Sequence, residues 1–247
     1  MENFSTNLIN KLKNANSVTV LTGAGVSAES GVPTFRDKDG LWNKFSPQDL
    51  ANMNSFLKNT ELVWEWYKWR KNLISNVSPN AGHYALSEME EYYTNKGKKF
   101  TLITQNVDDL HKKSGSKNIL ELHGNIMRSR CIKCNYSTEN MDNEKTIPTC
   151  IQCGNYLRPD VVWFGESLSE EILDKAFEEA ENCDVFFSIG TSSLVYPAAM
   201  LPVHARDEDA YIVEINPERS ALAYLFDEEI NKKSGEILPE IMQELKK

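Results

Sequence analysis

The chain has 247 residues, 40% of them hydrophobic, which is enough for one large domain or for one domain with a small insert. Its formal net charge of −9 argues against a nucleic-acid-binding surface, which normally carries a basic stripe. No apolar run approaches the ~20 residues of a membrane-spanning helix and no signal pattern begins the chain, so we expect a cytoplasmic monomer without membrane partners.

The predicted elements alternate between helices and short apolar strands. Phe4, Leu8 and Leu12 lie at helical spacing within residues 3–14, and the β-branched run 17–22 follows as a buried strand. Further strands are predicted at 100–104, 119–122, 185–189 and 211–215, and further helices at 60–75, 82–95, 169–181 and 236–246. This alternation predicts an α/β fold with a Rossmann-like, doubly wound parallel sheet.

Two segments interrupt this alternation. Residues 37–96 are mainly loop and helix, and residues 128–156 are polar, irregular and rich in cysteine. We interpret them as a helical insert and a zinc-binding insert, which together build a smaller lobe. The core would then comprise approximately residues 1–36, 97–127 and 157–247 of a single domain, 1–247.

A glycine loop follows the first predicted strand. Gly23, Gly25 and Ala28 fit the pattern G-x-G-x-x-A. Its glycines allow a tight turn and let backbone N–H groups approach a pyrophosphate at a helix N-terminus. The pattern indicates that a dinucleotide binds here.

The rest of this loop departs from an ordinary dinucleotide site. Gly31 and Pro33 should end the helix after little more than a turn, and Phe35 and Arg36 follow. A dehydrogenase would instead place an acidic residue at the end of a second strand ~20 residues after the glycines, and no strand ends there. We therefore expect a loop that does more than support hydride transfer.

Four cysteines form a metal-binding pattern. Cys131 and Cys134 make one C-x₂-C pair, Cys150 and Cys153 make a second, and fifteen residues separate the pairs. This spacing is typical of a four-thiolate zinc ribbon, in which no open coordination position remains, so the zinc would be structural. The alternatives are disulfides or chance. Five cysteines are too few for a secreted disulfide scaffold, and Cys183 fits a small buried hydrophobe.

Polar side chains follow two other predicted strands. The run 104–108 (Thr-Gln-Asn-Val-Asp) ends one strand, and His123 ends another. Ligands bind at the carboxyl edge of open α/β sheets, and a neutral imidazole there can act as a general base. From the residues alone, a structural histidine remains the stronger alternative for His123, as does simple strand termination for Asn106 and Asp108.

Taken together, these motifs resemble the sirtuins, which are NAD-dependent protein deacylases. The matching segments run in family order along nearly the whole chain. They comprise residues 23–36, 104–108, 123–124, 158–166 (Arg-Pro-Asp-Val-Val-Trp-Phe-Gly-Glu), 190–192, 216–218 and the four cysteines.

The resemblance implies an NAD site, one structural zinc ion and a catalytic base. The residues implied around NAD are Gly23, Ala24, Gly25, Glu29, Thr34, Phe35, Arg36, Trp42, Gln105, Asn106, Val107, Asp108, Gly190, Thr191, Ser192, Asn216, Pro217, Glu218 and Ser234. Asn106 and His123 would be catalytic. The acyl oxygen of a modified lysine would attack the ribose carbon that nicotinamide leaves, and His123 would take a proton from a ribose hydroxyl. Free lysine, nicotinamide and O-acyl-ADP-ribose would be the products.

The implied partner is an acylated lysine side chain of a protein or peptide. Val161, Val162, Trp163, Phe164 and Gly165 would contact it, and the run 161–164 could pair with the substrate backbone as an added strand. A plain core strand is the alternative for these residues. The position of Trp163 beside Gly165 suggests the rim of a site instead.

The helix predicted at 60–75 refines the substrate. Val63, Tyr67, Arg70 and Ile74 form one helical row in which Arg70 is the only charge, and Leu62, Trp66, Trp69 and Leu73 form an adjacent apolar row. A guanidinium in such a row either snorkels to water or receives an anion, and the pattern alone favours snorkelling.

Resemblance reverses that preference. Tyr67-x-x-Arg70 is similar to the tyrosine–arginine pair of the class III, desuccinylase-like bacterial sirtuins, and Ala51 falls where that subgroup has a small residue. An arginine fork matches a carboxylate in two places. We therefore expect removal of succinyl and malonyl groups as well as acetyl. A mono-ADP-ribosyltransferase or an NAD hydrolase on the same scaffold remains the alternative, distinguished by where the ADP-ribose goes.

Overall fold

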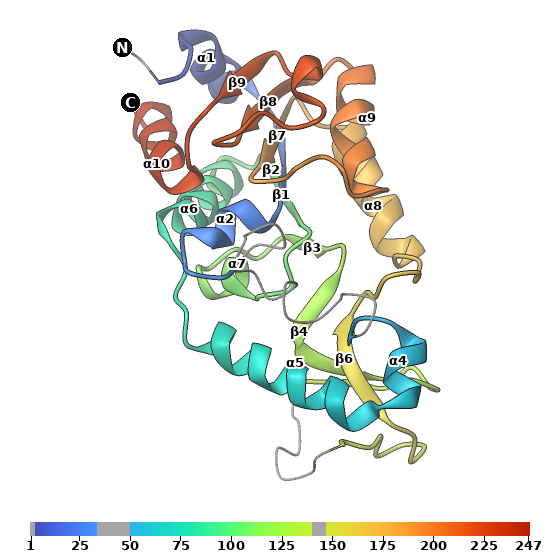
Figure 1. Cartoon of the computed structure of the whole chain (residues 1–247). Coiled ribbons are helices and arrows are strands. Elements are labelled where there is room, and N and C mark those ends of the chain that lie inside the picture. Colours follow the sequence, from blue (N-terminus) through green and yellow to red (C-terminus); the bar gives the residue numbers. More distant parts are fainter. Residues whose placement is uncertain (1–2, 34–49, 140–146) are drawn as a thin grey trace.

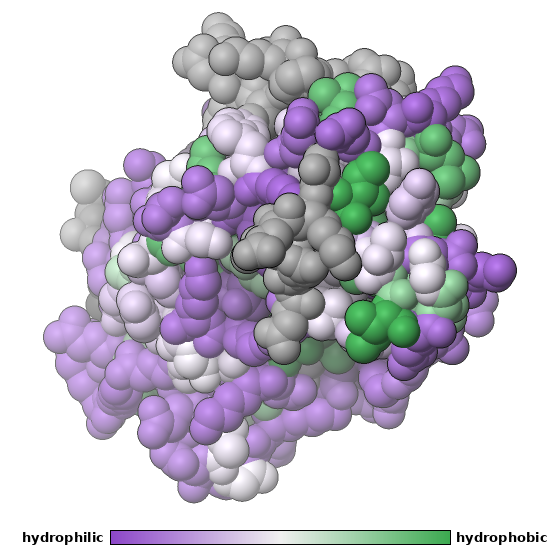
Figure 2. All heavy atoms as spheres, turned by 90° about the horizontal axis from the view of Figure 1, so that it is seen from below, coloured by the Kyte–Doolittle hydropathy of each residue, from purple (hydrophilic) through white to green (hydrophobic). Residues whose placement is uncertain are grey.

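A computed structural model describes residues 3–33, 50–139 and 147–247. The chain forms a larger lobe around a parallel sheet and a smaller lobe around a second, antiparallel sheet (Figure 1). Within these residues, no helix is long and apolar enough to cross a membrane. The face of the molecule seen from below, in Figure 2, is largely hydrophilic with separate hydrophobic spots.

The sheet of the larger lobe has six parallel strands in the order β3-β2-β1-β7-β8-β9. Its strands are β1 (Ser17–Thr22), β2 (Lys99–Thr104), β3 (Ile119–Glu121), β7 (Val185–Ile189), β8 (Tyr211–Ile215) and β9 (Glu228–Ile230). The order reverses between β1 and β7, which is the doubly wound arrangement that the alternation predicted. The predicted fold class is confirmed.

Helices cover both faces of this sheet. On one face lie α1 (Thr6–Asn14), α6 (Ala81–Asn95) and α10 (Ser234–Leu245), and on the other lie α8 (Glu170–Glu181) and α9 (Leu201–Asp207). Side chains of β1 alternate between them: Val18 and Val20 pack toward α1, α6 and α10, and Leu21 packs toward α8 and α9. Helix α6 therefore packs on the core sheet, although its residues lie in the segment that the sequence analysis assigned to the helical insert.

Short elements connect the layers. They are α2 (Ala24–Ala28), α7 (Leu110–Lys113) and the 3₁₀ turns η2 (Ala198–Met200) and η3 (Ala223–Leu225). Helix α2 ends after five residues, and Gly31 beyond it adopts φ +86°, a conformation that other residues rarely adopt. The early end predicted for this helix is confirmed.

The smaller lobe combines an antiparallel sheet with two helices. Its sheet has the order β5-β4-β6, and its elements are β4 (Gly124–Cys131), β5 (Ser137–Thr138), β6 (Leu157–Val161), α4 (Met53–Lys58) and α5 (Thr60–Ser75). Phe56, Trp64 and Trp163 pack in its core with two of the metal-site cysteines. Apolar residues and thiols thus share one core.

Helix α5 begins at a side-chain cap, because the Asn59 carboxamide oxygen accepts a hydrogen bond from the backbone N–H of Leu62 at 3.2 Å. Its row Val63, Tyr67, Arg70, Ile74 is buried. The adjacent apolar row is buried only in part: Trp66 is 6% exposed, whereas Leu62 is 41% and Trp69 is 48% exposed. The buried face of the helix also includes Trp64, which is 2% exposed and whose indole N–H donates to the Leu157 carbonyl at 3.0 Å.

Candidate active site and metal centre

A cleft of about 1460 Å³ opens where the strand order of the large sheet reverses, between β1 and β7. Loops that follow β1, β2, β7 and β8 line one part of it, and residues of the smaller lobe line the rest. Carboxyl ends of parallel strands meet at such a switch point, so side chains distant in sequence come together there.

All the site residues predicted for the cleft that lie within the described segments line it. From the larger lobe come Gly23, Ala24, Gly25, Glu29, Gln105, Asn106, Val107, Asp108, His123, Gly190, Thr191, Ser192, Asn216, Pro217, Glu218 and Ser234. From the smaller lobe and the segment after β6 come Ala51, Tyr67, Arg70, Val161, Val162, Trp163, Phe164 and Gly165. Thr34, Phe35, Arg36 and Trp42 lie outside the described residues.

The glycines of the loop after β1 serve close packing between two backbones. A Cβ atom on Gly23 or Gly25 would lie 2.8 Å from backbone atoms of Gly190. Gly190 itself has φ +60°, and a Cβ there would lie 2.6 Å from the Val26 nitrogen. The N–H of Gly25 already donates to the Gly190 carbonyl at 2.8 Å. Glycine is required here to bring the β1 and β7 loops together, a role that the sequence pattern did not reveal.

Amide side chains join the loops around the cleft. The Asn106 amide donates to the Gly23 carbonyl and to the Ser27 hydroxyl, both at 3.0 Å. The Gln105 amide donates to the Thr191 hydroxyl at 3.0 Å. The polar run after β2 therefore fixes the loops after β1 and β7 relative to each other.

Glu29 connects this region to the last helix. One of its carboxylate oxygens accepts from the Ser234 hydroxyl at 2.9 Å and from the backbone N–H of Gly235 at 3.0 Å. An acidic group at a helix N-terminus satisfies free N–H groups and complements the helix dipole. Glu29 and Ser234 thus line the cleft as predicted and also bond to each other.

One ring nitrogen of His123 is engaged by the backbone. Its Nδ1 lies 2.9 Å from the Gln105 carbonyl oxygen, which can only accept, so Nδ1 carries the proton and Nε2 is the free acceptor. Burial lowers the pKa of His123, and the hydrogen bond to Gln105 opposes this in part. The imidazole is therefore neutral at pH 7, as a base must be.

Two further histidines form a buried pair next to Ser27, which is a hydrogen-bond partner of Asn106, and no sequence motif indicated this arrangement. His83 and His111 are buried with ring centroids 4.7 Å apart, and His83 Nε2 lies 3.5 Å from the Ser27 hydroxyl. Burial lowers the pKa of His83 to about 4 and that of His111 well below its usual value. The nearest sequence signal is the helix cap at Asn80, which places His83 at the third position of α6.

The part of the cleft that the smaller lobe lines contains Arg70, of which only 9% is exposed. Its guanidinium carbon lies 5.4 Å from the centre of the Trp66 ring. Burial lowers the pKa of Arg70, and Tyr67 and Asp108 oppose this shift. The guanidinium is enclosed beside the cleft and does not snorkel to the outer surface, so the interpretation favoured by the helical pattern alone is wrong.

The segment after β6 differs from the expected rim. Trp163 is 2% exposed, whereas Phe164 is 60% exposed. The backbone N–H groups of residues 162–164 already donate within the chain, to the His123 carbonyl, the Glu166 carboxylate and the Ala51 carbonyl. None of these three N–H groups is left for an added strand, and the Trp163 carbonyl accepts from the Glu166 N–H at 3.0 Å. Trp163 belongs to the core of the smaller lobe.

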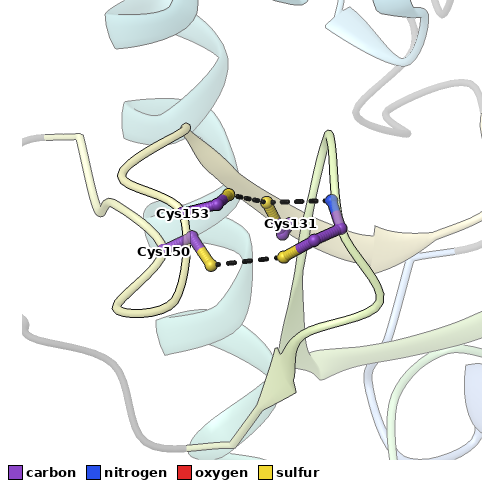
Figure 3. Close-up of side chains that lie close together, drawn as sticks. Cys131, Cys150 and Cys153 are labelled. Atoms are coloured by element: carbon purple, nitrogen blue, oxygen red, sulfur yellow. Dashed lines mark hydrogen bonds between the residues drawn. The ribbon is translucent and has the colours of Figure 1, made fainter.

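The four predicted zinc ligands meet at one point. Cys131 ends β4, Cys134 follows it, and Cys150 and Cys153 come from the loop before β6; Figure 3 shows the sulfur atoms turned toward one another. All four lie within 4.8 Å of each other, with Sγ–Sγ distances of 3.4 Å for Cys131–Cys153 and 3.6 Å for Cys134–Cys150.

These distances fit one tetrahedral zinc ion, for which Zn–S bonds of ~2.3 Å require sulfur atoms about 3.8 Å apart. Backbone N–H groups of Lys133 and Cys134 also point to the Cys131 sulfur, at 3.4 and 3.5 Å. Such donors stabilise thiolates. No disulfide forms among the five cysteines, all of which lie in the described residues, and Cys183 is buried separately as predicted.

Comparison with known proteins gives a consistent result. Residues 23–197 match the Sir2 family. NAD-dependent protein deacylases of Pyrococcus abyssi and Aquifex aeolicus are 46% and 47% identical to the chain; the alignments cover 96% and 95% of this chain and 96% and 97% of those proteins. A crystal structure of a Sir2 homolog–NAD complex superposes with a TM-score of 0.90 at 44% identity and covers 98% of this chain and 94% of that one. Cleft, metal centre and full-length similarity agree: the chain belongs to the Sir2 family, the sirtuins that its motifs resemble.

Proposed function

We propose that this chain removes succinyl and malonyl groups, as well as acetyl, from lysine side chains of proteins, and forms nicotinamide and O-acyl-ADP-ribose. The coarser activity, NAD-dependent protein deacylation, is that of its family. The observation that carries the finer proposal is the buried Arg70 guanidinium beside Tyr67 at the end of the cleft.

Bound NAD supplies the ribose carbon that nicotinamide leaves and the hydroxyl that later accepts the acyl group. The protein orders the loops of the site through Asn106 and Gln105. His123 would take the proton of a ribose hydroxyl at Nε2, while its Nδ1–H donates to the Gln105 carbonyl. Because burial lowers the pKa of His123, the acid limb of the kcat/KM profile should lie below the usual histidine value of ~6.5.

His123→Ala tests this base directly. Loss of a general base typically costs 10²- to 10⁴-fold in rate. We expect the loss on acetyl-lysine and on succinyl-lysine peptides alike, measured as NAD-dependent product formation by mass spectrometry. Turnover equal to that of the unmodified protein, or deacylation without NAD, would contradict the mechanism. ADP-ribose attached to protein as the sole product would support a transferase instead, and free ADP-ribose as the sole product would support an NAD hydrolase.

Arg70 and Tyr67 account for the acidic acyl preference. A guanidinium binds a carboxylate through two N–H groups, and a phenol hydroxyl can add a third bond. Each hydrogen bond to a charged group contributes ~1.5–3 kcal/mol, or roughly ten- to a hundredfold in rate or affinity. Ala51 also lines the cleft, and its small side chain favours an acyl chain longer than acetyl.

Arg70→Met tests the preference. We expect kcat/KM on succinyl-lysine peptides to fall roughly ten- to a hundredfold relative to that on acetyl-lysine peptides, because the carboxylate loses its cation. Lys68→Met is the matched control: it removes a positive charge from the same helix at a position that does not line the cleft. Equal losses on both peptides in Arg70→Met would contradict the assignment.

A further inference from the structure

A hydrogen bond buried beside the acyl end of the cleft joins two aromatic side chains. The indole N–H of Trp163 donates to the Tyr67 hydroxyl oxygen at 2.7 Å. The ring centroids lie 6.3 Å apart, and both residues are 2% exposed. Tyr67 comes from α5 and Trp163 from the segment after β6, so the bond connects two elements that both line the cleft.

This bond determines what the Tyr67 hydroxyl can do. A phenol O–H lies near the ring plane and has two favourable orientations. Because the indole N–H approaches the oxygen from one side, the hydroxyl hydrogen must turn to the other. Among the described residues, no group accepts that hydrogen, and burial raises the pKa of Tyr67 to about 12, so the hydroxyl stays protonated. It is a donor that lacks an acceptor.

The Trp163 ring is itself held in place. The buried Arg158 guanidinium lies 3.4 Å from the centre of the ring. The Glu166 carboxylate pairs with Arg158 and accepts the Trp163 backbone N–H at 2.9 Å. A charged pair thus clamps the indole from its backbone and from its face, which limits the directions in which its N–H can point.

We propose that Trp163 is a positioning residue for acidic acyl substrates, which turns the Tyr67 hydroxyl hydrogen toward the substrate carboxylate. This inference rests on the proposed function, because it needs an acidic acyl group as the acceptor. Trp163 acts through Tyr67 and does not need to touch the acyl chain. An acetyl group has no carboxylate at that place and gains nothing from the orientation.

A double-mutant cycle tests this role through the ratio of kcat/KM on succinyl-lysine to kcat/KM on acetyl-lysine. Trp163→Phe should lower the ratio about three- to tenfold, and Tyr67→Phe about tenfold. In the Tyr67→Phe background, Trp163→Phe should lower the ratio no further, because no hydroxyl remains to be oriented. Replacement of Trp163 by 3-benzothienylalanine, which keeps the shape and removes the N–H, should reproduce the effect of Trp163→Phe.

Trp64→Phe is the matched control. It also removes a buried indole N–H that is hydrogen-bonded, at 3.0 Å to the Leu157 carbonyl, but Trp64 does not line the cleft. A purely structural role of Trp163 would lower both activities together and leave the ratio unchanged, as Trp64→Phe should. That result overturns the inference, and so does an equal fall of the ratio with and without Tyr67.

The same measurements separate this inference from the proposed function. The proposed function fails if the unmodified protein does not prefer succinyl-lysine, or if Arg70→Met leaves that preference unchanged. The role of Trp163 then fails with it. If that preference and its loss in Arg70→Met are both observed while Trp163→Phe keeps the ratio, only the role of Trp163 is overturned.

Discussion

The two lobes hold together by different means. In the larger lobe, six parallel strands are covered on both faces by apolar helix surfaces. In the smaller lobe, a short antiparallel sheet shares its core with two of the four clustered cysteines, Cys131 and Cys150, and two buried guanidinium groups, those of Arg70 and Arg158, lie in the same lobe. Burial of apolar surface can stabilise the first lobe alone, whereas we expect the second to need a metal ion and ion pairs as well.

This difference places the more varied side chains where we propose that the acyl-lysine substrate binds. Loops of the larger lobe provide glycine backbones and amides, which suit a cofactor common to a family. The smaller lobe provides the side chains of Tyr67, Arg70 and Trp163, so a single substitution there changes the chemistry of the cleft. Specificity for the acyl group can therefore change in the smaller lobe without disturbing the cofactor loops.

Zinc removal should give the largest difference in stability between the two lobes. A structural zinc site contributes roughly 10 kcal/mol or more to folding, so chelation or Cys150→Ser should unfold the smaller lobe while the larger lobe persists. Hydrogen exchange should then rise in β4 and β6 and stay low in β1 and β7. Cys183→Ser is the control, since this thiol lies outside the cluster and should leave the zinc content at one ion. Unchanged protection of β4 after zinc loss would refute the dependence.

Within the smaller lobe, two tryptophans of α5 should differ by a large factor. Trp64 is 2% exposed and hydrogen-bonded, so Trp64→Ala should cost about 3–5 kcal/mol of unfolding free energy. Trp69 is 48% exposed, and Trp69→Ala should cost less than about 1 kcal/mol. Urea denaturation of both variants measures this. Similar costs would mean that the helix packs on a different face.

The larger lobe should lose stability in acid through its buried histidines. His83 has a pKa of about 4 in the folded protein, below the ordinary value of 6.5, so the unfolded chain binds more protons between these pH values. Its contribution of up to about 3 kcal/mol is complete above pH 6.5 and falls as the pH drops toward 4. His111 acts in the same direction.

His83→Gln should flatten this dependence, because glutamine retains an acceptor for the helix cap and does not titrate. His204→Gln is the control: this side chain is 39% exposed and lies outside the cluster. Urea midpoints between pH 4 and 7 provide the measurement. An equally steep acid dependence in His83→Gln would assign the sensitivity to other groups.

The larger lobe was the more predictable part from sequence. Strands β1, β2, β7 and β8 are runs of apolar and β-branched residues buried on both faces, and such runs stand out in a polar chain. Strands β4 and β6 were not predicted as strands. Charged residues lie in both strands, and Arg128 of β4 pairs with Asp160 of β6, while Pro159 interrupts the strand signal of β6.

The site divides in the same way. Loops after parallel strands and the C-x₂-C pairs could be placed from local pattern, because topology brings the former together and spacing defines the latter. The bond between Tyr67 and Trp163 joins residues 96 positions apart, and no periodicity signals it. The pairing of His83 with His111 likewise depends on how α6 and α7 meet. Such contacts exist only once the lobes have folded.

The bond from Glu29 to Ser234 and Gly235 has a consequence for the order of synthesis. Glu29 follows the first loop of the cleft, and its hydrogen-bond partners lie more than 200 positions later in the sequence. Both ends of the described chain lie on one side of the larger lobe (Figure 1). A ribosome must therefore release α10 before that loop gains its last support. Nascent chains that end before Ser234 can build the β1–β2 pairing but lack the hydrogen bonds that hold Glu29, so the cleft becomes complete only in a chain that includes α10.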